Sequence, residues 1–366
     1  MPETVPHVVF RGVSKTFDGV TNVVADLDLE VGKGEFVTFL GPSGSGKTTC
    51  LNMLAGFVAV SSGTILVHGR SVEQVPPRKR GIGMVFQNYA LFPHLTVAGN
   101  LSFPLEVRGV GEARRKKLVA RALEQVRLQG FEDRRPSRLS GGQQQRVAIA
   151  RALVFEPDLV LMDEPLGALD RRLREELQYE IRGLQRRLGI TCIYVTHDQQ
   201  EAMVLSDRVA VFRAGRLEQV DTPEGLYEEP QRSFVARFVG ENNRIPGVVE
   251  ELDRGLCTVR AGSGRIRALR VVPDAVGQPT TVSIRPERIG FAVAPGSYRN
   301  EFSARVEDVT FLGDHLRVTL SVFAKRDMVL TIPNTVGHGG VLPGDEVRIG
   351  WAATDCRALD CEDDGP

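Results

Sequence analysis

The sequence is poor in the residues that build disulfide frameworks and zinc sites, with 5 Cys and 6 His among 366 residues. The cysteines are scattered along the chain, which argues against a disulfide framework and favours reduced thiols in a cytosolic compartment. Cys356 and Cys361 are close in sequence, but no histidine or second cysteine pair accompanies them. We therefore expect no zinc-type site at these two cysteines.

The chain also lacks a net charge and a long apolar run. Lys and Arg together number 46, as do Asp and Glu, which argues against nucleic acid as the main partner because phosphate binding depends on basic side chains. The longest apolar run, Leu51–Val60, is about half as long as a membrane-spanning helix. Residues 1–7 do not show the charged-then-apolar pattern of a signal peptide. We expect neither a membrane-spanning segment nor a signal peptide.

The length is sufficient for two domains, and the composition is that of an ordinary globular protein. From Val8 to about Gly240, short apolar runs alternate with helical patterns such as Arg172–Leu188. This alternation predicts an α/β domain in which helices cover a parallel sheet. The runs with the length of buried parallel strands are Phe36–Leu40, Ile82–Phe86, Leu159–Met162 and Cys192–Val195.

The pattern changes after about Glu241, where short β-rich segments are separated by Gly and Pro and no long helical pattern occurs. We expect a separate all-β domain, built as one or two small OB-like barrels. The boundary is predicted within Val239–Asn243, which gives domains at 1–240 and 241–366. The predicted strands are Val248–Leu252, Leu256–Arg260, Ile266–Val271, Thr281–Ile284, Phe302–Val309, Leu316–Val322, Asp327–Ile332 and Glu346–Gly350.

The segment Gly41–Thr48 matches the phosphate-binding pattern GxxxxGK[ST], between a predicted strand and a helix that begins at Lys47. Its glycines allow backbone N–H groups to converge on a phosphate, and the helix N-terminus adds a favourable dipole. We expect Lys47 to reach the β- and γ-phosphates and the Thr48 hydroxyl to hold Mg²⁺. The alternative is a plain Gly/Ser-rich turn. The candidate nucleotide-binding residues are Gly41, Pro42, Ser43, Gly44, Ser45, Gly46, Lys47 and Thr48.

Two acids follow the apolar strand Leu159–Met162 at its carboxyl end, the edge where open α/β sheets bind ligands. We expect Asp163 to bind Mg²⁺ through water and Glu164 to act as general base on the attacking water. Adjacent carboxylates elsewhere usually form a solvated strand end, which is the alternative interpretation here.

Gln87 and His197 also follow predicted strands. We expect Gln87 to contact Mg²⁺ or the attacking water, and His197 to contact the γ-phosphate. Each residue by itself is a weak indication, because a histidine after a strand is more often an ordinary surface or core residue. Their positions matter because both residues follow the carboxyl ends of predicted strands, which places them at the same edge of the sheet as Asp163.

Leu139–Gln143 has the sequence LSGGQ and precedes a predicted helix, which Ser140 would cap. The glycines expose backbone N–H groups beside the cap, so Ser140, Gly141, Gly142 and Gln143 form a second candidate anion site. One molecule cannot readily bring this site and Lys47 to the same γ-phosphate, whereas a head-to-tail pair can. The alternative is a simple capped turn.

In this order along the chain, these segments resemble the ATP-binding subunits of ABC transporters over roughly residues 8–240. The resemblance implies a P-loop NTPase fold with a helical subdomain at about 88–157, and ATP and Mg²⁺ as ligands. The segments that carry it are Gly41–Thr48, Gln87, Leu139–Gln143, Asp163–Glu164, Gly167–Asp170 and His197.

The resemblance also implies roles for single residues. Ser43–Thr49 would bind ATP, which adds Thr49 to the loop. Glu164 would be the catalytic base and His197 the sensor of the γ-phosphate. Asp170 would couple the two sites of a dimer. Phe17 stands where the family stacks an aromatic ring on adenine; the family residue is usually Tyr, so stacking is expected without the hydroxyl.

Further segments resemble importer subunits that dock a separate membrane protein, notably Gln87–Thr96. Ser283–Glu287 and Phe311–Asp314 are similar to segments of TOBE domains, and the Glu241–Asn243 junction is nearest to the polyamine (spermidine/putrescine) group. The resemblance implies two permease subunits, an extracytoplasmic solute-binding protein as an indirect partner, and a place on the cytoplasmic face of the inner membrane. Importers of sugar, sulfate, thiamine and ferric iron share most of these features and remain open.

Other classes of protein are weighed against this interpretation. A non-transport ABC ATPase of DNA repair or translation usually carries coiled-coil insertions or two fused cassettes, and neither occurs here. A sugar importer whose tail binds a regulator is a further alternative. A kinase-like phosphotransferase would explain Gly41–Thr48 but not Leu139–Gln143.

Overall fold

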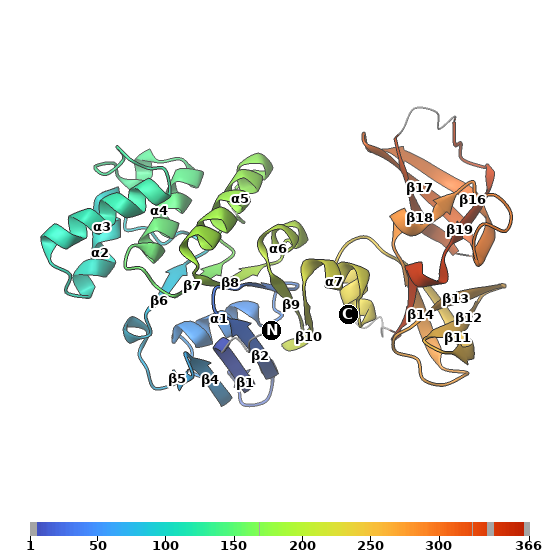
Figure 1. The fold of residues 1–366 in the computed structure, drawn as a ribbon, viewed down its shortest axis with the longest axis horizontal. Helices are drawn as coiled ribbons and strands as arrows, with labels where there is room; N and C mark the ends of the chain where they lie inside the picture. Colours follow the sequence, from blue (N-terminus) through green and yellow to red (C-terminus); the bar gives the residue numbers. More distant parts are fainter. Residues whose placement is uncertain (1–5, 168, 324, 335–339, 362–366) are drawn as a thin grey trace. The chain divides into compact units, whose positions relative to one another are not determined.

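The computed structural model describes residues 6–167, 169–323, 325–334 and 340–361 (Figure 1). The chain forms two compact units, Met1–Gly225 and Leu226–Pro366. This division lies earlier in the chain than the boundary expected after Gly240, because helix α8 (Ser233–Phe238) belongs to the second unit. There the Ser233 backbone N–H donates a hydrogen bond to Asp360 Oδ1 at 2.7 Å.

A six-stranded sheet forms the centre of the first unit, in the order β10-β9-β3-β8-β7-β6. All neighbouring strands are parallel except β10 and β9. The four strands expected from apolar runs are confirmed, with ends within one residue of those predicted. The strands are β3 (Phe36–Leu40), β6 (Ile82–Val85), β7 (Leu159–Asp163), β8 (Thr191–Thr196), β9 (Arg208–Arg213) and β10 (Arg216–Asp221).

Side chains along these strands enter two hydrophobic clusters, one on each face of the sheet, because successive residues of a strand point to opposite faces. On β7, Val160 and Met162 join one cluster, whereas Leu159 and Leu161 join the other. Burial on both faces explains why the strands appear in the sequence as unbroken apolar runs.

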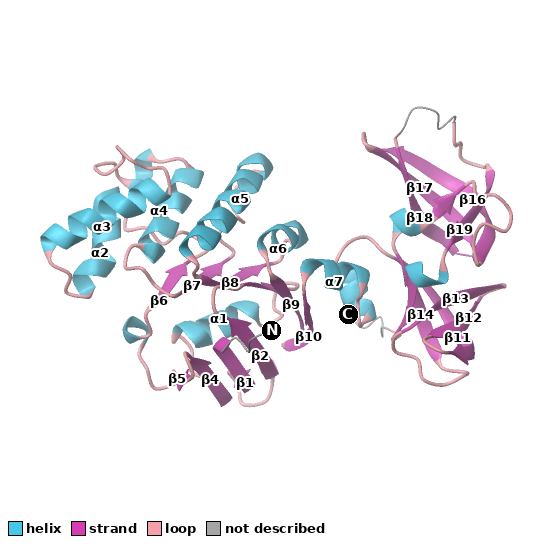
Figure 2. Cartoon of the chain, in the orientation of Figure 1, coloured by secondary structure: helices cyan, strands magenta, loops and turns pink. Residues whose placement is uncertain are grey.

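The first of these clusters is completed by helices, which Figure 2 shows gathered on one side of the central sheet. Three of them lie between β6 and β7, in the segment expected to form the helical subdomain. The helices on this side are α2 (Val97–Val107), α3 (Glu112–Gln125), α4 (Gly141–Leu153), α5 (Arg171–Leu188) and α6 (Gln199–Leu205).

The second cluster contains helix α1 (Lys47–Ala55) and a four-stranded antiparallel sheet of order β2-β1-β4-β5. The α/β alternation of the sequence does not indicate this sheet. Phe10, Leu27 and Ile65 from its strands are buried against the same face of the central sheet as α1. The strands are β1 (Pro6–Thr16), β2 (Asn22–Gly32), β4 (Ser62–Val67) and β5 (Arg70–Ser71).

The second unit contains a closed barrel of order β11-β12-β13-β20-β14 and a five-stranded sheet of order β15-β19-β16-β17-β18. The all-β prediction is confirmed. Of the one or two barrels expected, one forms, and the other five strands make an open sheet. The fully buried Trp351 lies in the hydrophobic cluster that both share. The strands are β11 (Asn243–Asp253), β12 (Leu256–Ala261), β13 (Gly264–Arg270), β14 (Pro279–Ile284), β15 (Gly290–Phe291), β16 (Asn300–Phe311), β17 (His315–Val322), β18 (Lys325–Pro333), β19 (Glu346–Trp351) and β20 (Cys356–Leu359).

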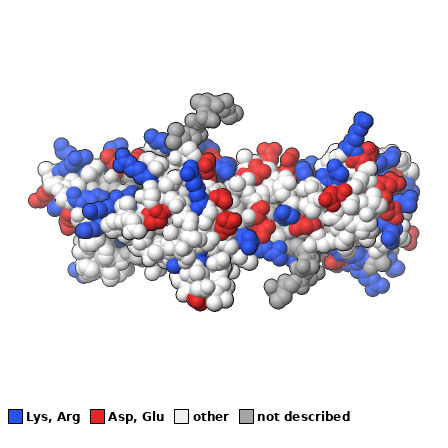
Figure 3. All heavy atoms as spheres, turned by 90° about the horizontal axis from the view of Figure 1, so that it is seen from below, with Lys and Arg blue, Asp and Glu red and all other residues white. Residues whose placement is uncertain are grey.

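Short elements complete the chain. Helix α7 (Pro223–Glu228) spans the division between the units, and single 3₁₀ turns occur at Pro77–Lys79, Pro136–Arg138, Pro286–Arg288 and Ala353–Asp355. Within the described residues, none of the helices has the length and apolar character needed to cross a membrane. On the face shown in Figure 3, acidic and basic side chains are interspersed, in keeping with their equal numbers.

Candidate functional site

The phosphate-loop segment turns tightly between β3 and α1, and its glycines are required by the surrounding backbone. A Cβ on Gly41 would lie 2.4 Å from the carbonyl oxygen of Phe212. Gly46 has a φ of 96°, and a Cβ there would lie 2.6 Å from the carbonyl oxygen of Val23. Around Gly44, by contrast, a Cβ would meet no atom within 4 Å. The loop is therefore packed on one side and open on the other, as a phosphate cradle must be.

The ammonium group of Lys47 lies inside this loop. Its Nζ donates to the carbonyl oxygens of Gly41 and Pro42, each at 2.8 Å, and lies 3.3 Å from Ser45 Oγ. Only 4% of the residue is exposed, and this burial lowers the pKa of Lys47. The carboxylates of Glu164 and Asp163 act in the opposite direction and raise that pKa. The loop thus holds a positive charge where a phosphate would bind.

The first turn of α1 contacts the end of β7. Thr48 Oγ1 donates a hydrogen bond to Asp163 Oδ1 at 2.9 Å. The pKa of Asp163 is raised, chiefly by burial, and the hydrogen bond from Thr48 offsets part of this rise. A hydroxyl and a carboxylate at one point are oxygen donors of the kind that Mg²⁺ prefers, so the residues present fit this ion.

Four neighbouring parallel strands, β3, β8, β7 and β6, lead into the phosphate loop, His197, Asp163–Glu164 and Gln87, respectively. Figure 1 labels β6, β7 and β8 side by side in this sheet. The register places Leu40 beside Thr196, Asp163 beside Val195, and Met162 beside Val85. The carboxyl ends of the four strands therefore meet along one edge of the sheet, where ligands of such folds bind.

Glu164 is the point at which side chains from three of these strands meet. Its Oε1 lies 3.1 Å from His197 Nδ1, and its Oε2 accepts a hydrogen bond from Gln87 Nε2 at 3.3 Å. The Glu164 backbone N–H donates to the carbonyl oxygen of Val195 at 3.0 Å, and its φ is 43°. A left-handed conformation is unfavourable for a glutamate and is typical of functional sites.

The LSGGQ segment forms a capping box at the start of α4. Ser140 Oγ accepts from the Gln143 backbone N–H at 3.3 Å, and Gln143 Oε1 accepts from the Ser140 backbone N–H at 3.0 Å. A Cβ on Gly142 would lie 2.8 Å from Leu173 Cδ2, whereas Ser140 and Gly141 are exposed. Among the described residues, none of these hydrogen bonds reaches the phosphate loop. Within this chain, Asp163 thus contacts the phosphate loop and Glu164 contacts Gln87 and His197, whereas the capping-box hydrogen bonds of Ser140 stay within its own segment.

Asp170 caps helix α5, and its Oδ1 accepts a hydrogen bond from the Leu173 backbone N–H at 3.1 Å. Of the Gly167–Asp170 segment, Ala168 lies outside the described residues. Neither observation tests the expected role of Asp170 between two chains.

Phe17 follows β1 directly and is 65% exposed, with Lys15 Nζ 4.8 Å from its ring centre. The turn that contains Phe17 leads into β2, where Val23 O approaches Gly46. The exposed ring therefore belongs to a turn that leads into the strand beside the phosphate loop.

One supporting residue is missed by the sequence patterns. Gly215, in the turn between β9 and β10, donates its backbone N–H to Ser45 O at 3.2 Å. A Cβ at Gly215 would lie 2.6 Å from Val23 O. In the sequence this glycine indicates only a turn, because its contact with the phosphate loop depends on how β9 pairs with β3.

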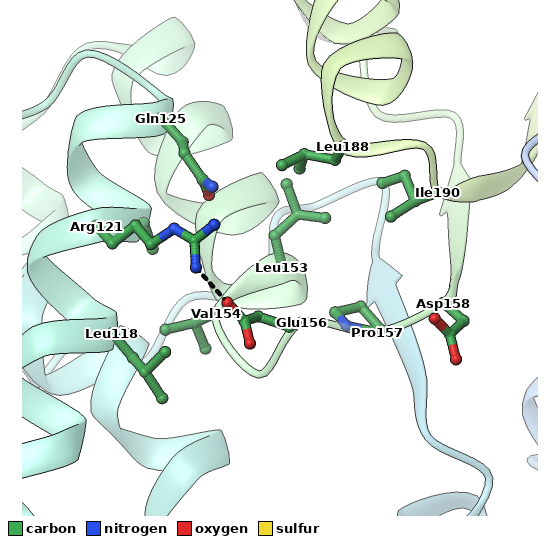
Figure 4. Close-up of a pocket in the computed structure, with 11 residues that line it drawn as sticks. Leu118, Arg121, Gln125, Leu153, Val154, Glu156, Pro157, Asp158, Leu188 and Ile190 are labelled. Carbon is green, nitrogen blue, oxygen red and sulfur yellow. Dashed lines mark hydrogen bonds and ion pairs between the residues drawn. The ribbon is translucent and has the colours of Figure 1, made fainter.

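A cavity of about 200 Å³ lies near the start of β7, at the opposite end of this strand from Asp163 (Figure 4). Figure 4 shows Arg121 of α3 reaching Glu156, with Arg121 Nη1 2.6 Å from Glu156 Oε1. None of the predicted site residues lines this cavity. It is therefore separate from the candidate nucleotide site.

Comparison with known proteins identifies the families that this chain resembles. The family model described as ABC transporter matches residues 24–167, and the model of the TOBE domain matches residues 282–359. Similar proteins include spermidine/putrescine import ATP-binding proteins of Rubrobacter xylanophilus (44% identity; 96% of this chain and 93% of the relative) and Pseudomonas aeruginosa (43%; 95% and 97%). The protein of the same name from a Nostoc species is 41% identical over 96% of this chain and 93% of its own.

Two solved structures share the fold of about three fifths of the chain. One is cbiO1 of Clostridium perfringens, part of an ABC transporter complex, with a TM-score of 0.58 and 29% identity over 61% of this chain and 91% of its own. The other is an ATP-binding cassette solved as a dimer in a post-hydrolysis state with ADP and Pi. Its TM-score is 0.53, and it is 32% identical over 59% of this chain and 98% of its own. The chain therefore belongs to the family of ABC transporter ATP-binding proteins, ATPases of the P-loop fold, in the form that carries a TOBE domain.

Proposed function

We propose that this chain is the ATP-hydrolysing subunit of an ABC importer for polyamines such as spermidine and putrescine. The hydrolytic part is supported above all by the meeting of Gln87 and His197 on the two oxygens of Glu164. The substrate class is supported by relatives named as spermidine/putrescine import proteins, which are similar over nearly the whole chain.

The nucleotide is held by Ser43–Thr49, with Lys47 at its phosphates and Phe17 stacked on its base. Mg²⁺, when bound, would neutralise phosphate charge; Thr48 would hold it directly, Asp163 would hold it through water, and Gln87 would contact it or the attacking water. The open face around Gly44 and the oxygen donors at the end of β7 support these assignments.

Glu164 accepts the proton of the water that attacks the γ-phosphate. Its two contacts hold the carboxylate at the strand end, and His197 provides the link to the γ-phosphate. Removal of this proton makes the water a stronger nucleophile. As the water oxygen bonds to the γ-phosphorus, the bond from that phosphorus to the β–γ bridging oxygen breaks and ADP leaves, while Lys47 stabilises the negative charge that develops on the phosphate oxygens.

The working unit is a head-to-tail homodimer. Ser140, Gly141, Gly142 and Gln143 of one protomer close over the nucleotide held by its partner, and Asp170 couples the two sites. The exposed serine, whose hydrogen bonds do not reach the phosphate loop of its own chain, supports this arrangement, as does the dimeric state of one solved relative. The dimer drives two permease subunits from the cytoplasmic face of the inner membrane, and a solute-binding protein delivers the polyamine to them.

Uptake measurements test this function. Cells from which the gene for this chain has been deleted should take up labelled spermidine poorly, and the intact chain should restore uptake while the Glu164→Gln variant should not. Maltose, sulfate, thiamine and ferric iron serve as matched cargoes whose uptake should not change. Loss of one of these uptakes instead would reassign the cargo, and failure to retain any membrane subunit in a pull-down would favour a non-transport ATPase.

A further inference from the structure

A buried hydrogen-bond network lies behind His197. Glu201 of α6 is 2% exposed, and its Oε2 accepts hydrogen bonds from the hydroxyls of Tyr194 and Thr196, each at 2.7 Å. Thr196 Oγ1 in turn accepts from the Asp198 backbone N–H at 3.0 Å. The residues on both sides of His197 are therefore fixed to β8 and α6.

Arg174 of α5 connects this network to a second loop. Its Nη1 donates to Asp198 Oδ2 at 3.0 Å, and its Nη2 donates to the backbone oxygen of Leu169 at 3.0 Å. Its Nε lies 3.8 Å from Glu201 Oε1. Asp198 directly follows His197 and Leu169 directly precedes Asp170, so one guanidinium contacts both loops.

The chemistry of the guanidinium suits this double contact. Its planar fork donates in two fixed directions at once, whereas a lysine ammonium is a single point charge on a flexible stem. The side chains of Arg174 and Asp198 are only 28% and 26% exposed. The pair is therefore shielded from most of the solvent that weakens surface ion pairs.

We propose that Arg174 is a positioning residue for the hydrolysis step. It fixes the position of the loop that carries His197 relative to the loop that carries Asp170. His197 thereby keeps its 3.1 Å contact with Glu164 while the second loop keeps the shape in which it meets the partner chain. This inference rests on the roles proposed above for Glu164, His197 and Asp170.

The test compares Arg174→Met, which keeps the apolar stem and removes the donors, with the purified wild-type chain. The kcat for ATP hydrolysis should fall about tenfold to a hundredfold, because small misplacements of catalytic groups have effects of this size. The KM for ATP should stay within about twofold, since Arg174 makes no hydrogen bond to the described phosphate loop. Arg174→Lys should restore part of kcat, because one of the two contacts can form.

Arg172→Met is the matched control. Arg172 is two residues away on the same helix, its side chain is 91% exposed, and its Nε lies 3.4 Å from Glu176 Oε1. Its kcat should equal that of the wild type. An equal fall in both variants, or an unchanged kcat in Arg174→Met, would overturn the inference.

Asp198→Asn provides a second route if Arg174→Met fails to fold. An asparagine retains an oxygen to cap α6, where Asp198 Oδ1 accepts from the Gln200 N–H at 2.8 Å, but loses the charge that faces Arg174. Its kcat should fall, and combining it with Arg174→Lys should cost less than the product of the two single losses. Fully multiplicative losses would show that the two residues act separately. Normal turnover in Glu164→Gln would instead refute the proposed function itself.

Discussion

Thr48 and Asp163 are hydrogen-bonded through their side chains although 115 residues separate them in the sequence. The contact joins the first turn of α1 to the carboxyl end of β7, and it places two oxygen donors at one point. The proposed binding site for Mg²⁺ therefore depends on two elements that no local sequence pattern connects.

Replacing Asp163 tests this point. In Asp163→Asn the Mg²⁺ concentration that gives half-maximal ATPase activity should rise at least about tenfold, because a charged oxygen ligand is lost. The measurement is a magnesium titration at fixed ATP. Asp158→Asn, at the other end of β7 where the side chain is 72% exposed, is the control. Equal magnesium requirements in the two variants would contradict the assignment.

Glu164→Gln should bind ATP with near-normal affinity and hydrolyse it about a hundredfold or more slowly, since the amide cannot accept a proton from water. Its neighbours Gln87 and His197 can still contact the amide, so the loop should keep its shape. Binding is measured with a fluorescent ATP analogue and turnover by phosphate release. Turnover within twofold of the wild type would rule out Glu164 as the base.

Composite sites predict rescue between two inactive variants. Lys47→Met and Ser140→Ala should each hydrolyse ATP poorly as homodimers. In a mixed dimer, the intact phosphate loop of one chain faces the intact Ser140 of the other, so one site of two is complete and activity should return. The readout is phosphate release after the two purified variants are mixed. Activity that never exceeds the sum of the separate variants would exclude the head-to-tail arrangement.

Gly46→Ala should lower the free energy of unfolding by about 1–3 kcal/mol, because its φ of 96° is unfavourable for alanine and the new Cβ would approach Val23 O. Gly183→Ala is the opposite case. Gly183 lies exposed inside α5 with no atom within 4 Å of an added Cβ, so alanine there should stabilise by about 0.5–1 kcal/mol. Urea titrations of both variants check the contrasting signs.

The stability of the first unit should decrease on mild acidification through His7. His7 is 3% exposed and hydrogen-bonded to the Thr191 hydroxyl, and its Nε2 lies 3.1 Å from His68 Nε2. Burial first, and then the nearby His68 and Lys33, lower its pKa to about 4, against the opposing effect of Asp158.

The His7 imidazole thus binds a proton less readily in the folded chain than in the unfolded chain, in which its pKa is about 6.5. The stability contribution is complete above pH 6.5 and is lost as the pH falls towards 4, at up to about 1.4 kcal/mol per pH unit. Urea unfolding of the wild type and His7→Gln at pH 7.5 and 5 should show a smaller pH effect in the variant. The same pH effect in both chains would exclude His7 as its source.

The strands and motifs that depend on local composition could be predicted. Strands such as β8 (Thr191–Thr196) are buried on both faces and therefore form apolar runs that are visible without any structure. The N-terminal antiparallel sheet and the short strand β20, which closes the barrel, could not be predicted in this way. Their formation depends on pairing with partners far along the chain, as in the pairing of Ile284 with Cys356.

The site shows the same division. Its residue types were fixed by local patterns: a glycine-rich turn before Lys47, two acids after an apolar run, and a serine at a helix cap. These patterns lie within short segments of neighbouring residues, so the sequence alone determined them. The tertiary structure decided which residues meet, because the strand order β3-β8-β7-β6 places His197 and Gln87 on Glu164. It alone also brought in Gly215 and Arg174, since contacts between separate elements follow from long-range strand pairing and helix packing rather than from neighbouring residues.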